Sequence, residues 1–439
     1  MRLALAVALG VVALGAARPA HAFCGFFVGK ADARLFNKSS QVAIVRDGDH
    51  TVITMGNDFR GPLTEFALVV PVPAVLTREQ IHVGDPGLLA RLDSYSAPRL
   101  VEYNDPDPCE PPRIMAMMAP SSAAMKSELA RGHVRDEPKL GVTVEAEYTV
   151  GEYDIVLLSA QESSGLETWL RESGYRIPQK AADALSPYVK QKMKFFVAKV
   201  NLKEQKAAGF QSLRPIQIAF DSPRFMLPIR LGMANGDGAQ DLLIYAITRK
   251  GRVESTNYPT VRMPSDAEVP EYIQKDFGHF YKDAFEHAWR GHGQRALLTE
   301  YVWNMGFCDP CSAPPLETAE LQALGVFWLG DSGYHGGGMP LTLTRLHVRY
   351  DAEHFPEDLA FQDTGDQQPF QGRYVLRHPW KGETSCAAGR EYLEQLRVRH
   401  QQEARTLAQL TGWKENDIQK QMGSDAPRPP PPFWKKLWQ

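Results

Sequence analysis

The chain has 439 residues, of which 23% are charged and 43% are hydrophobic, and its formal net charge is −3 at pH 7. This balanced composition argues against nucleic acid as a partner, because binding to phosphates requires a concentrated basic surface. The length allows one elaborated domain or two to three ordinary ones, and a core of that size can form without disulfides.

The N-terminus carries the pattern of a secretory signal peptide. Arg2 precedes an apolar run at residues 3–16, and the small-residue site Ala20-His21-Ala22 follows. The run is too short to span a bilayer, and this order of charge, apolar run and A-x-A site is typical of export signals. We predict that residues 1–22 are removed and that the mature chain begins at Phe23.

The remainder of the chain contains no run of about 18 to 20 apolar residues, so we expect no transmembrane segment in the mature protein. A periplasmic or extracellular location is therefore expected. In such an oxidising compartment the 5 cysteines favour disulfides, and their odd number leaves one without a partner in the chain.

The cysteine spacing suggests which pairs form. Cys308 and Cys311 are close enough in sequence to pair locally. The other three, Cys24, Cys109 and Cys386, then allow three pairings, of which we favour Cys24 with Cys109. The partner of Cys386 stays open.

The first half of the chain predicts strands and hairpins. Short apolar segments flank Asp47-Gly48, and a second pair flanks Gly151, and both turns are hairpin signals. Residues 104–140 are crowded with Pro, Ser, Ala and Met and lack periodicity, which predicts a loop or mobile insertion. The predicted strands are 42–45, 51–55, 66–72, 142–150 and 153–159.

The next segments mix helices with strands. Ser164 with Glu167 three residues later predicts a capping box at the start of a helix. Residues 225–231 and 241–248 flank a turn rich in Asn, Asp and Gly, which predicts one more hairpin. Further elements are a helix at 179–193 and a strand at 195–200. Hairpins mixed with helices indicate an α+β fold of antiparallel sheets with packed helices.

Five separated motifs occur in a recognisable order. They are APRLVEYNDPDPC, GEYDIVLLSAQESSGLETWLRESGYRIP, FMLPIRLGMANGDGAQDLLIY, FCDPCSAPPL and TRLHVRYDAEHFPEDLAF. The chain resembles the bacterial secreted proteins catalogued as domain of unknown function 2330, from about Cys24 to about Pro379. The resemblance implies an exported bacterial protein without an assigned activity.

The segment from Cys308 to Cys311, CDPC, has three interpretations: a local disulfide, a redox-active dithiol and half of a metal site. A redox dithiol needs its first thiol at a helix N-terminus, where the helix dipole stabilises the thiolate. Pro314 and Pro315 are tolerated only in a helix's first turn, so the helix starts near Ser312 or later and leaves Cys308 outside it. We favour a structural disulfide. The alternative is thiol–disulfide exchange, with Cys308 attacking and Cys311 resolving.

Two glycine-rich motifs resemble parts of serine hydrolases. Gly330-Asp331-Ser332-Gly333 matches the residues around a protease nucleophile, and His335-Gly336-Gly337-Gly338 resembles the oxyanion loop of some esterases. A nucleophilic serine also needs a histidine base held by a carboxylate, and Tyr334 replaces the last glycine of a G-x-S-x-G elbow. We prefer a surface loop before a strand at 341–350 and keep hydrolysis as a second alternative.

Metal binding finds little support in the sequence. No second CxxC or HxxxH motif supplies the two ligands that CDPC lacks for zinc. Residues 271–290 have apolar side chains at helical spacing, which predicts an amphipathic helix. His287 falls on the apolar face of that helix, so a hydrogen-bonded core histidine is preferred over a metal ligand.

The C-terminal segment differs from the rest. Residues 389–413 are rich in Arg, Gln and Glu and carry a narrow stripe of apolar residues at helical spacing. This pattern predicts a helix that packs on its own domain or docks on a partner. Pro427 and residues 429–432 predict an extended polyproline spacer, followed by an aromatic and basic tip at 433–438. This helix and tail are the candidate contact with an envelope component.

The sequence therefore predicts three parts: a signal peptide at 1–22, an α+β core at 23–385, and a helical segment with a Pro-rich tail at 386–439. We expect an exported, non-catalytic binding or structural module of the cell envelope, without cofactor or metal. The alternatives are a thiol–disulfide oxidoreductase using Cys308 and Cys311, and a serine hydrolase.

Overall fold

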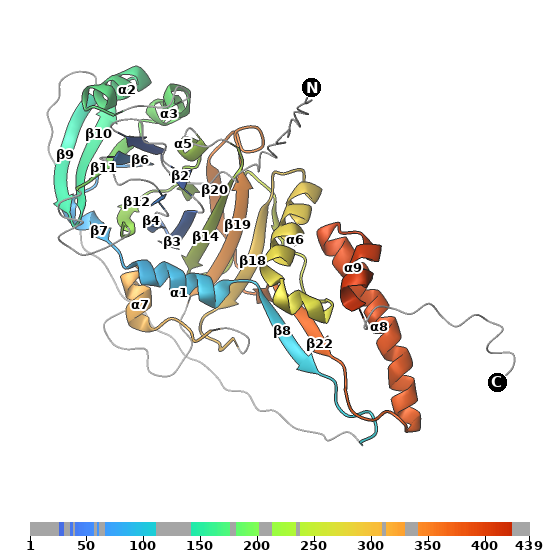
Figure 1. Ribbon diagram of the computed structural model, residues 1–439. Coiled ribbons are helices and arrows are strands. Elements are labelled where there is room, and N and C mark those ends of the chain that lie inside the picture. Colours follow the sequence, from blue (N-terminus) through green and yellow to red (C-terminus); the bar gives the residue numbers. More distant parts are fainter. Residues whose placement is uncertain are drawn as a thin grey trace, which may run out of the picture.

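The computed structural model describes eleven segments of the chain (Figure 1), and every structural statement below concerns these residues. They are 26–29, 36–37, 40–56, 59–60, 66–110, 142–175, 181–201, 213–233, 238–309, 313–329 and 341–423. The fold is α+β, with antiparallel and mixed sheets and packed helices, as predicted.

A 9-stranded sheet forms the centre of the molecule, in the order β16-β18-β19-β14-β3-β4-β12-β7, with β21 beside β18. The pairs β14–β3 and β16–β18 are parallel, and the other pairs are antiparallel. Its strands are β3 (Ser40–Asp47), β4 (His50–Gly56), β7 (Ile81–Val83), β12 (Ile216–Asp221), β14 (Gln240–Thr248), β16 (Thr260–Arg262), β18 (Leu297–Asn304), β19 (Thr342–Tyr350) and β21 (Phe370–Gln371).

A 5-stranded antiparallel sheet in the order β1-β6-β11-β10-β9 lies against one face of the central sheet. Its strands are β1 (Phe26–Gly29), β6 (Phe66–Val72), β9 (Val142–Val150), β10 (Tyr153–Ala160) and β11 (Lys194–Val200). The predicted hairpins form: β3 and β4 meet at Gly48, β9 and β10 at Gly151, and both glycines have positive φ, +60° and +56°.

Smaller sheets and short elements complete the core. The small sheets are β13-β20-β15, β17-β22-β8 and β2-β5, built from β2 (Phe36–Asn37), β5 (Phe59–Arg60), β8 (Arg99–Asn104), β13 (Met226–Leu227), β15 (Val253–Ser255), β17 (Ala267–Glu268), β20 (Leu359–Asp363) and β22 (Arg373–His378). The helices are η1 (Arg78–Gln80), α1 (Pro86–Ser96), α2 (Ser163–Glu172), α3 (Ala181–Lys190), α5 (Arg230–Met233), η2 (Glu271–Lys275), α6 (Phe277–Gly291), α7 (Thr318–Ala323), α8 (Ala387–Thr411) and α9 (Glu415–Met422).

The alternation of side chains along the strands creates the layers. In β6, Leu68 and Val70 face the central sheet, whereas Ala67 and Val69 face α2 and α3. The opposite face of the central sheet packs against α1, α7 and α6. The order is therefore helices, five-stranded sheet, nine-stranded sheet, helices, and a largely apolar core lies between the two sheets.

The hairpin predicted from 225–231 and 241–248 is wrong. The first segment forms β13, which pairs with β20, and then the short helix α5. The second segment is β14, a central strand that pairs with β19 and β3. A turn signal reports only a local backbone preference. The apolar strand β14 instead lies between two strands that are distant in sequence, which bury it on both edges.

Two helix details also differ from prediction. Helix α2 starts at Ser163, one residue before the predicted cap, and Glu162 precedes it without a side-chain capping hydrogen bond. The helix predicted at 271–290 is divided by Asp276 into η2 and α6. On α6 the buried face is Phe280, Ala284, Phe285, Ala288 and Trp289, and His287 is exposed beside Gly412, so the prediction of a core histidine is wrong.

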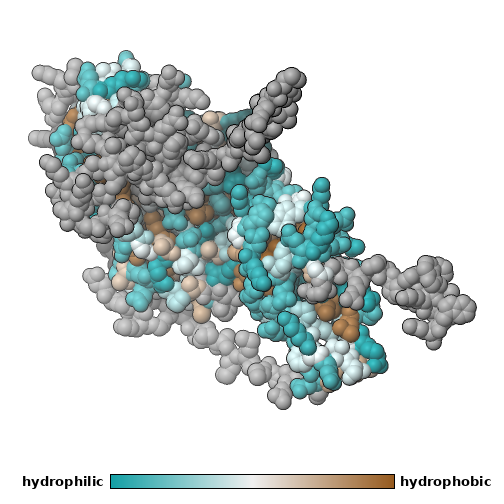
Figure 2. All heavy atoms as spheres, in the orientation of Figure 1, coloured by the Kyte–Doolittle hydropathy of each residue, from teal (hydrophilic) through white to brown (hydrophobic). Residues whose placement is uncertain are grey.

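The C-terminal helix packs on its own domain, as one of the two alternatives predicts. Ala404 and Leu407 of α8 are fully buried against α6. In Figure 1, β8 and β22 extend side by side from the sheets, and α8 runs beside them. Figure 2 shows a mostly hydrophilic surface on this side with a small hydrophobic patch. In the described part of the chain, no helix is long and apolar enough to cross a membrane.

The signal-peptide prediction at 1–22 lies outside the described residues, as do the Pro-rich tail after Gly423 and residues 111–140 of the insertion predicted at 104–140.

Candidate functional site

An apolar cleft of about 200 Å³ lies between the two large sheets and is the candidate binding site. Strands β4 and β12 of the central sheet and β6 of the smaller sheet form its floor and sides. The turn before β11 and the segment around β13 complete the wall. The described lining residues are Ile53, Met55, Val70, Pro71, Pro73, Gln191, Met193, Ile218, Phe220, Ser222, Pro223, Arg224, Met226, Leu227 and Pro228.

The floor of the cleft follows from strand register. Ile218 of β12 lies opposite Ile53 of β4, and Ile216 lies opposite Met55, so apolar side chains of both strands point to the same face. Ile53, Met55 and Ile218 are at most 4% exposed. Methionine side chains are flexible and polarisable, so a floor that contains Met55 can adapt to apolar groups of different shapes.

The mouth of the cleft is polar. Gln191, Pro223 and Arg224 are exposed, whereas the residues below them are mostly buried. Arg224 Nη1 donates a hydrogen bond of 2.6 Å to Gln191 Oε1, which joins the two sides of the opening. An apolar interior with a few polar groups at the rim is the usual composition of a small-molecule site.

One side of the mouth, the lip, comprises residues 222–224 and is fixed by the β3–β4 hairpin. The Ser222 backbone N–H donates to the Asp49 carbonyl oxygen at 2.9 Å. Arg46 Nη2 donates to the Ser222 carbonyl oxygen at 3.0 Å, and the Arg224 N–H donates to Ser222 Oγ at 3.1 Å. Arg46 is only 7% exposed. The lip is therefore held in position without a ligand.

The chain that continues from the lip is fixed by Asp358, which is 6% exposed. Its carboxylate accepts hydrogen bonds from Tyr188 Oη at 2.6 Å and from the Ile229 N–H at 2.9 Å. Arg230 donates to the other oxygen from Nε at 3.2 Å and Nη2 at 3.0 Å. One buried carboxylate, in the loop before β20, thus connects α3 with the segment after β13, and the described lining of the cleft includes Met226, Leu227 and Pro228 just before that segment.

A second polar cluster, the ionic ladder, lies on the other face of the central sheet. Arg345, His347 and Arg349 alternate along β19 and so share one face. A β-bulge between Thr299 and Tyr301 adds Glu300 to β18 and directs its carboxylate to the same face. Glu300 accepts hydrogen bonds from Arg345 Nε at 2.6 Å and from Tyr281, and contacts His347 Nδ1 at 2.8 Å.

The ionic ladder continues through Asp241, which contacts His347 Nε2 at 3.4 Å. Burial alone would lower the pKa of His347, but Glu300 and Asp241 outweigh it and raise that pKa. Burial would likewise raise the pKa of Glu300, but His347 and Arg345 lower it to about 2. An imidazolium held between two carboxylates has no free lone pair for proton abstraction.

The ionic ladder fastens helices to the central sheet. Phe285 of α6 stacks on the His347 ring with centroids 3.7 Å apart. Glu300 is completely buried, and Arg345 is 5% exposed. These groups fasten α6 and α1 to the sheet, since Arg345 Nη1 also reaches Asp93 of α1 at 2.7 Å. No sequence motif indicated this cluster, although alternating charges along 345–349 are unusual for a central strand.

The CDPC segment follows β18, and the structure describes it as far as Asp309. Cys308 is an exposed free thiol, so the structure does not show the predicted bond to Cys311, which lies outside the described residues. Helix α7 begins only at Thr318, ten residues after Cys308. As predicted, the helix starts too far away for its dipole to act on that sulfur. Tyr301 Oη instead fixes the segment by donating to Asp309 Oδ2 at 2.8 Å.

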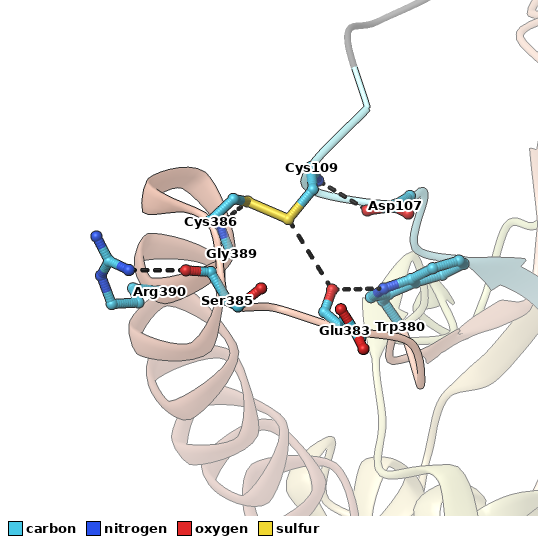
Figure 3. The surroundings of a disulfide bond; sticks show 8 residues. All are labelled: Asp107, Cys109, Trp380, Glu383, Ser385, Cys386, Gly389 and Arg390. Atoms are coloured by element: carbon cyan, nitrogen blue, oxygen red, sulfur yellow. Dashed lines mark hydrogen bonds between the residues drawn. A yellow bond between two sulfur atoms is a disulfide. The ribbon is translucent and has the colours of Figure 1, made fainter.

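The preferred pairing of Cys24 with Cys109 is wrong, because Cys109 is bonded to Cys386, with a Cα–Cα distance of 6.0 Å (Figure 3). The parallel pairing of β8 and β22 explains the partner: Asn104 and His378 lie side by side, so the segments that follow the two strands leave the same end of the sheet. Cys386 is also the N-cap of α8, where its sulfur accepts a hydrogen bond from the Gly389 N–H at 3.1 Å.

The remaining sequence candidates fall partly outside the described residues. Ser332 and His335 lie outside the described residues, so serine hydrolysis stays a prediction that labelling by a fluorophosphonate would test. His279 contacts Asp276 and Asp283, and its ring lies tilted beside that of Trp413, with centroids 5.2 Å apart. Within the described ranges, no group of three or more His, Cys, Asp or Glu side chains is arranged to hold a metal ion.

The observed arrangement is a layered α+β protein whose two packed sheets enclose an apolar cleft. A family model described as an uncharacterized protein conserved in bacteria, DUF2330, matches residues 18–362. The chain belongs to this family. No curated protein and no solved structure matches the chain.

Proposed function

We propose that this protein is an exported, non-catalytic binding module of the cell envelope that holds a small apolar ligand in the cleft between its two large sheets. The observation that carries the proposal is the cleft itself, with its buried apolar floor, its polar mouth and its fixed walls. A preformed site of this kind binds without the cost of ordering mobile loops.

The chemistry of the lining supports binding rather than catalysis. Among the described lining residues, the polar groups are the amide of Gln191, the hydroxyl of Ser222 and the guanidinium of Arg224. Ser222 Oγ already accepts a backbone hydrogen bond. General acid–base or nucleophilic catalysis needs a titratable partner beside such a hydroxyl, and the lining described here contains no carboxylate, imidazole or thiol.

Export is supported by two independent features. The first is the charged, apolar and A-x-A order at residues 1–22. The second is the Cys109–Cys386 disulfide, because such bonds persist mainly in oxidising compartments. Intact-mass measurement of the protein from a periplasmic or secreted fraction is expected to give a chain that begins at Phe23 and has this bond. A mature protein that retains residues 1–22 would contradict export with cleavage.

Binding is tested with N-phenyl-1-naphthylamine, a neutral apolar dye whose fluorescence rises in apolar surroundings. We expect the mature protein to bind the dye saturably. In Met226→Trp the larger side chain on the cleft wall occupies part of the cleft, and this variant is expected to bind the dye at least tenfold more weakly. The matched control Val144→Trp adds the same ring to an exposed position on β9 and is expected to have no effect. Absence of saturable binding, or equal binding by Met226→Trp, would remove the proposal.

Thiol–disulfide exchange remains a second candidate, because Cys308 is an exposed thiol. The measurement is catalysis of insulin reduction by the mature protein and by Cys308→Ser. We expect no catalysis by either protein, since the first described helix after Cys308 begins only at Thr318. Turnover that is lost in Cys308→Ser would make this candidate the function.

A further inference from the structure

Arg224 gives the mouth of the cleft a single charge. Among the described residues that line the cleft, it is the one charged side chain, and it is exposed at the opening. Its guanidinium carries five N–H donors, of which one is used in the hydrogen bond to Gln191. Within the described part of the chain no carboxylate forms an ion pair with it. The opening therefore presents unused cationic donors directly above an apolar floor.

Gln191 adds to this donor surface. Its amide oxygen accepts the hydrogen bond from Arg224, so its NH₂ group is turned away from Arg224 and keeps its two donors. Two acidic residues close in sequence to the lip or bonded to it have cationic or imidazole partners of their own: Asp221 of β12 contacts His50 Nδ1 at 2.6 Å, and Asp49 lies 3.6 Å from Arg46. Charge at the mouth thus favours an acceptor group with negative charge.

The position of these donors is fixed by the lip. Arg46 and Asp49 bond the backbone of Ser222, and the Arg224 N–H bonds the Ser222 side chain. The backbone of Arg224 is therefore held at the opening, so only its side chain has to be ordered when an anion binds. Preorganisation of this kind directs affinity towards one class of head group.

The size of the cleft sets the apolar part of the ligand. A dry apolar cavity of about 150 Å³ accepts benzene, so the 200 Å³ here accommodate an apolar group of somewhat more than six carbons. The floor is formed by Ile53, Met55 and Ile218, which can follow an unbranched chain. Unbranched tails of about eight to ten carbons are therefore the range to test against this volume.

From the charge at the mouth and the apolar floor, we propose that the cleft binds a medium-chain carboxylate, with its tail on the floor between β4 and β12 and its carboxylate on Arg224 and Gln191. This inference rests on the proposed function and names its ligand class. Each additional methylene that reaches the floor is expected to tighten binding about fourfold. Binding is also expected to weaken with added salt, because the head group is at the surface.

The experiment measures displacement of N-phenyl-1-naphthylamine from the mature protein by three ten-carbon probes: decanoate, decan-1-ol and decyltrimethylammonium. We expect decanoate to displace the dye, and Arg224→Gln to weaken decanoate about tenfold while changing decan-1-ol less than threefold. Arg290→Gln, which removes an exposed guanidinium on α6, is the matched control and is expected to leave decanoate unchanged. Octanoate is expected to bind more weakly than decanoate.

The outcomes separate the two proposals. If the dye binds but decanoate does not displace it, or if Arg224→Gln leaves decanoate affinity unchanged, the carboxylate inference is wrong and the binding function stands. Preferential displacement by decyltrimethylammonium would also overturn it. If the dye itself does not bind, the binding function fails first. Circular dichroism of Arg224→Gln shows whether it is folded, and Gln191→Ala provides a second variant at the same mouth.

Discussion

Asp358 shows how one buried residue can fix a segment next to the cleft. Its carboxylate receives hydrogen bonds from Tyr188 and from the adjacent residues Ile229 and Arg230, so two segments that are distant in sequence meet at the loop that carries Asp358. The cleft lining includes Gln191, just after α3, and Met226, Leu227 and Pro228, just before Ile229. A buried carboxylate is stable only when its lone pairs are filled, and this one is filled by protein groups alone.

Asp358→Ala is therefore expected to lower the free energy of unfolding by about 3 to 5 kcal/mol, because it leaves the Arg230 charge without its partner. The measurement is urea denaturation followed by circular dichroism. The control is Asp363→Ala, a partly exposed carboxylate 3.5 Å from Lys250, which is expected to cost less than about 1 kcal/mol. Equal losses for the two variants would show that Asp358 does not hold the wall.

His347 makes a stability contribution that depends on pH. Its pKa in the folded protein is raised by Glu300 and Asp241 above the value of about 6.5 in an unfolded chain. Its ion pairs are therefore fully present below about pH 6.5 and are lost as pH rises through the folded pKa. The difference in unfolding free energy between the wild type and His347→Gln is expected to be larger at pH 6 than at pH 9.

Denaturation of both proteins across that range measures this difference, with His287→Gln, at an exposed position on α6, as the control. A difference that stays constant with pH, or grows towards pH 9, would contradict the ion-pair assignment of His347.

Residues with local roles could be predicted, and residues with distant partners could not. Gly48 and Gly151 stand at hairpin turns that need a positive φ, which glycine adopts readily. The sequence around each glycine therefore predicts the turn. Glu300 occupies a bulge that depends on the register of β18 against β19. The cleft depends on two sheets meeting, so its residues appear in the sequence only as ordinary apolar strands.

At the scale of elements, the disulfide closes the end of the arm formed by β8, β22 and α8. Cys109 lies five residues after β8, and Cys386 starts α8. In the double variant Cys109→Ser/Cys386→Ser, serine keeps the N-cap acceptor at 386 but removes the covalent bond. The first turns of α8 are expected to exchange their amide hydrogens at least tenfold faster than in the wild type.

Hydrogen exchange read by mass spectrometry over residues 387–396 measures this effect, and Cys308→Ser serves as the control. Peptide mapping without reduction is expected to recover Cys109 joined to Cys386. Unchanged exchange in the double variant would show that contacts such as Arg399 with Asp105, at 2.8 Å, hold the arm without the bond.

The failed hairpin prediction has a cause at the same scale. The segment that became β14 is apolar along most of its length, and five consecutive residues at its end are buried. Such a strand is most stable in the middle of a sheet, where it has neighbours on both edges. Its neighbours, β3 and β19, lie about 200 residues before it and 100 residues after it. A turn motif carries no information about partners at that separation.

At the scale of the whole molecule, the layers explain why a cleft exists between two sheets. Each sheet is covered on its outer face by helices, so both inner faces are free to pack together. Twisted sheets do not remain in contact over their full area. Where they separate, apolar side chains of β4, β6 and β12 line a space instead of touching. The α+β class was predictable from hairpins and helices, but this separation depends on how the layers pack.

The C-terminal helices belong to this packing although they follow the part of the chain that matches the family model. Leu407 of α8 is fully buried with Phe280 and Trp289 of α6, whereas Val398 on the same helix is 65% exposed. Leu407→Ala is therefore expected to cost about 2 to 5 kcal/mol of unfolding free energy, and Val398→Ala less than about 0.5 kcal/mol.

Deleting residues 382–439 would remove both C-terminal helices and expose the apolar face of α6 at Phe280, Ala284 and Ala288. The shortened protein is expected to bind an apolar dye nonspecifically and to unfold at a lower temperature than the complete mature chain. Differential scanning calorimetry of both forms measures the change. If the shortened protein melts at the same temperature, and Leu407→Ala behaves like Val398→Ala, then α8 and α9 form a separate module, and their apolar stripe is available to a partner.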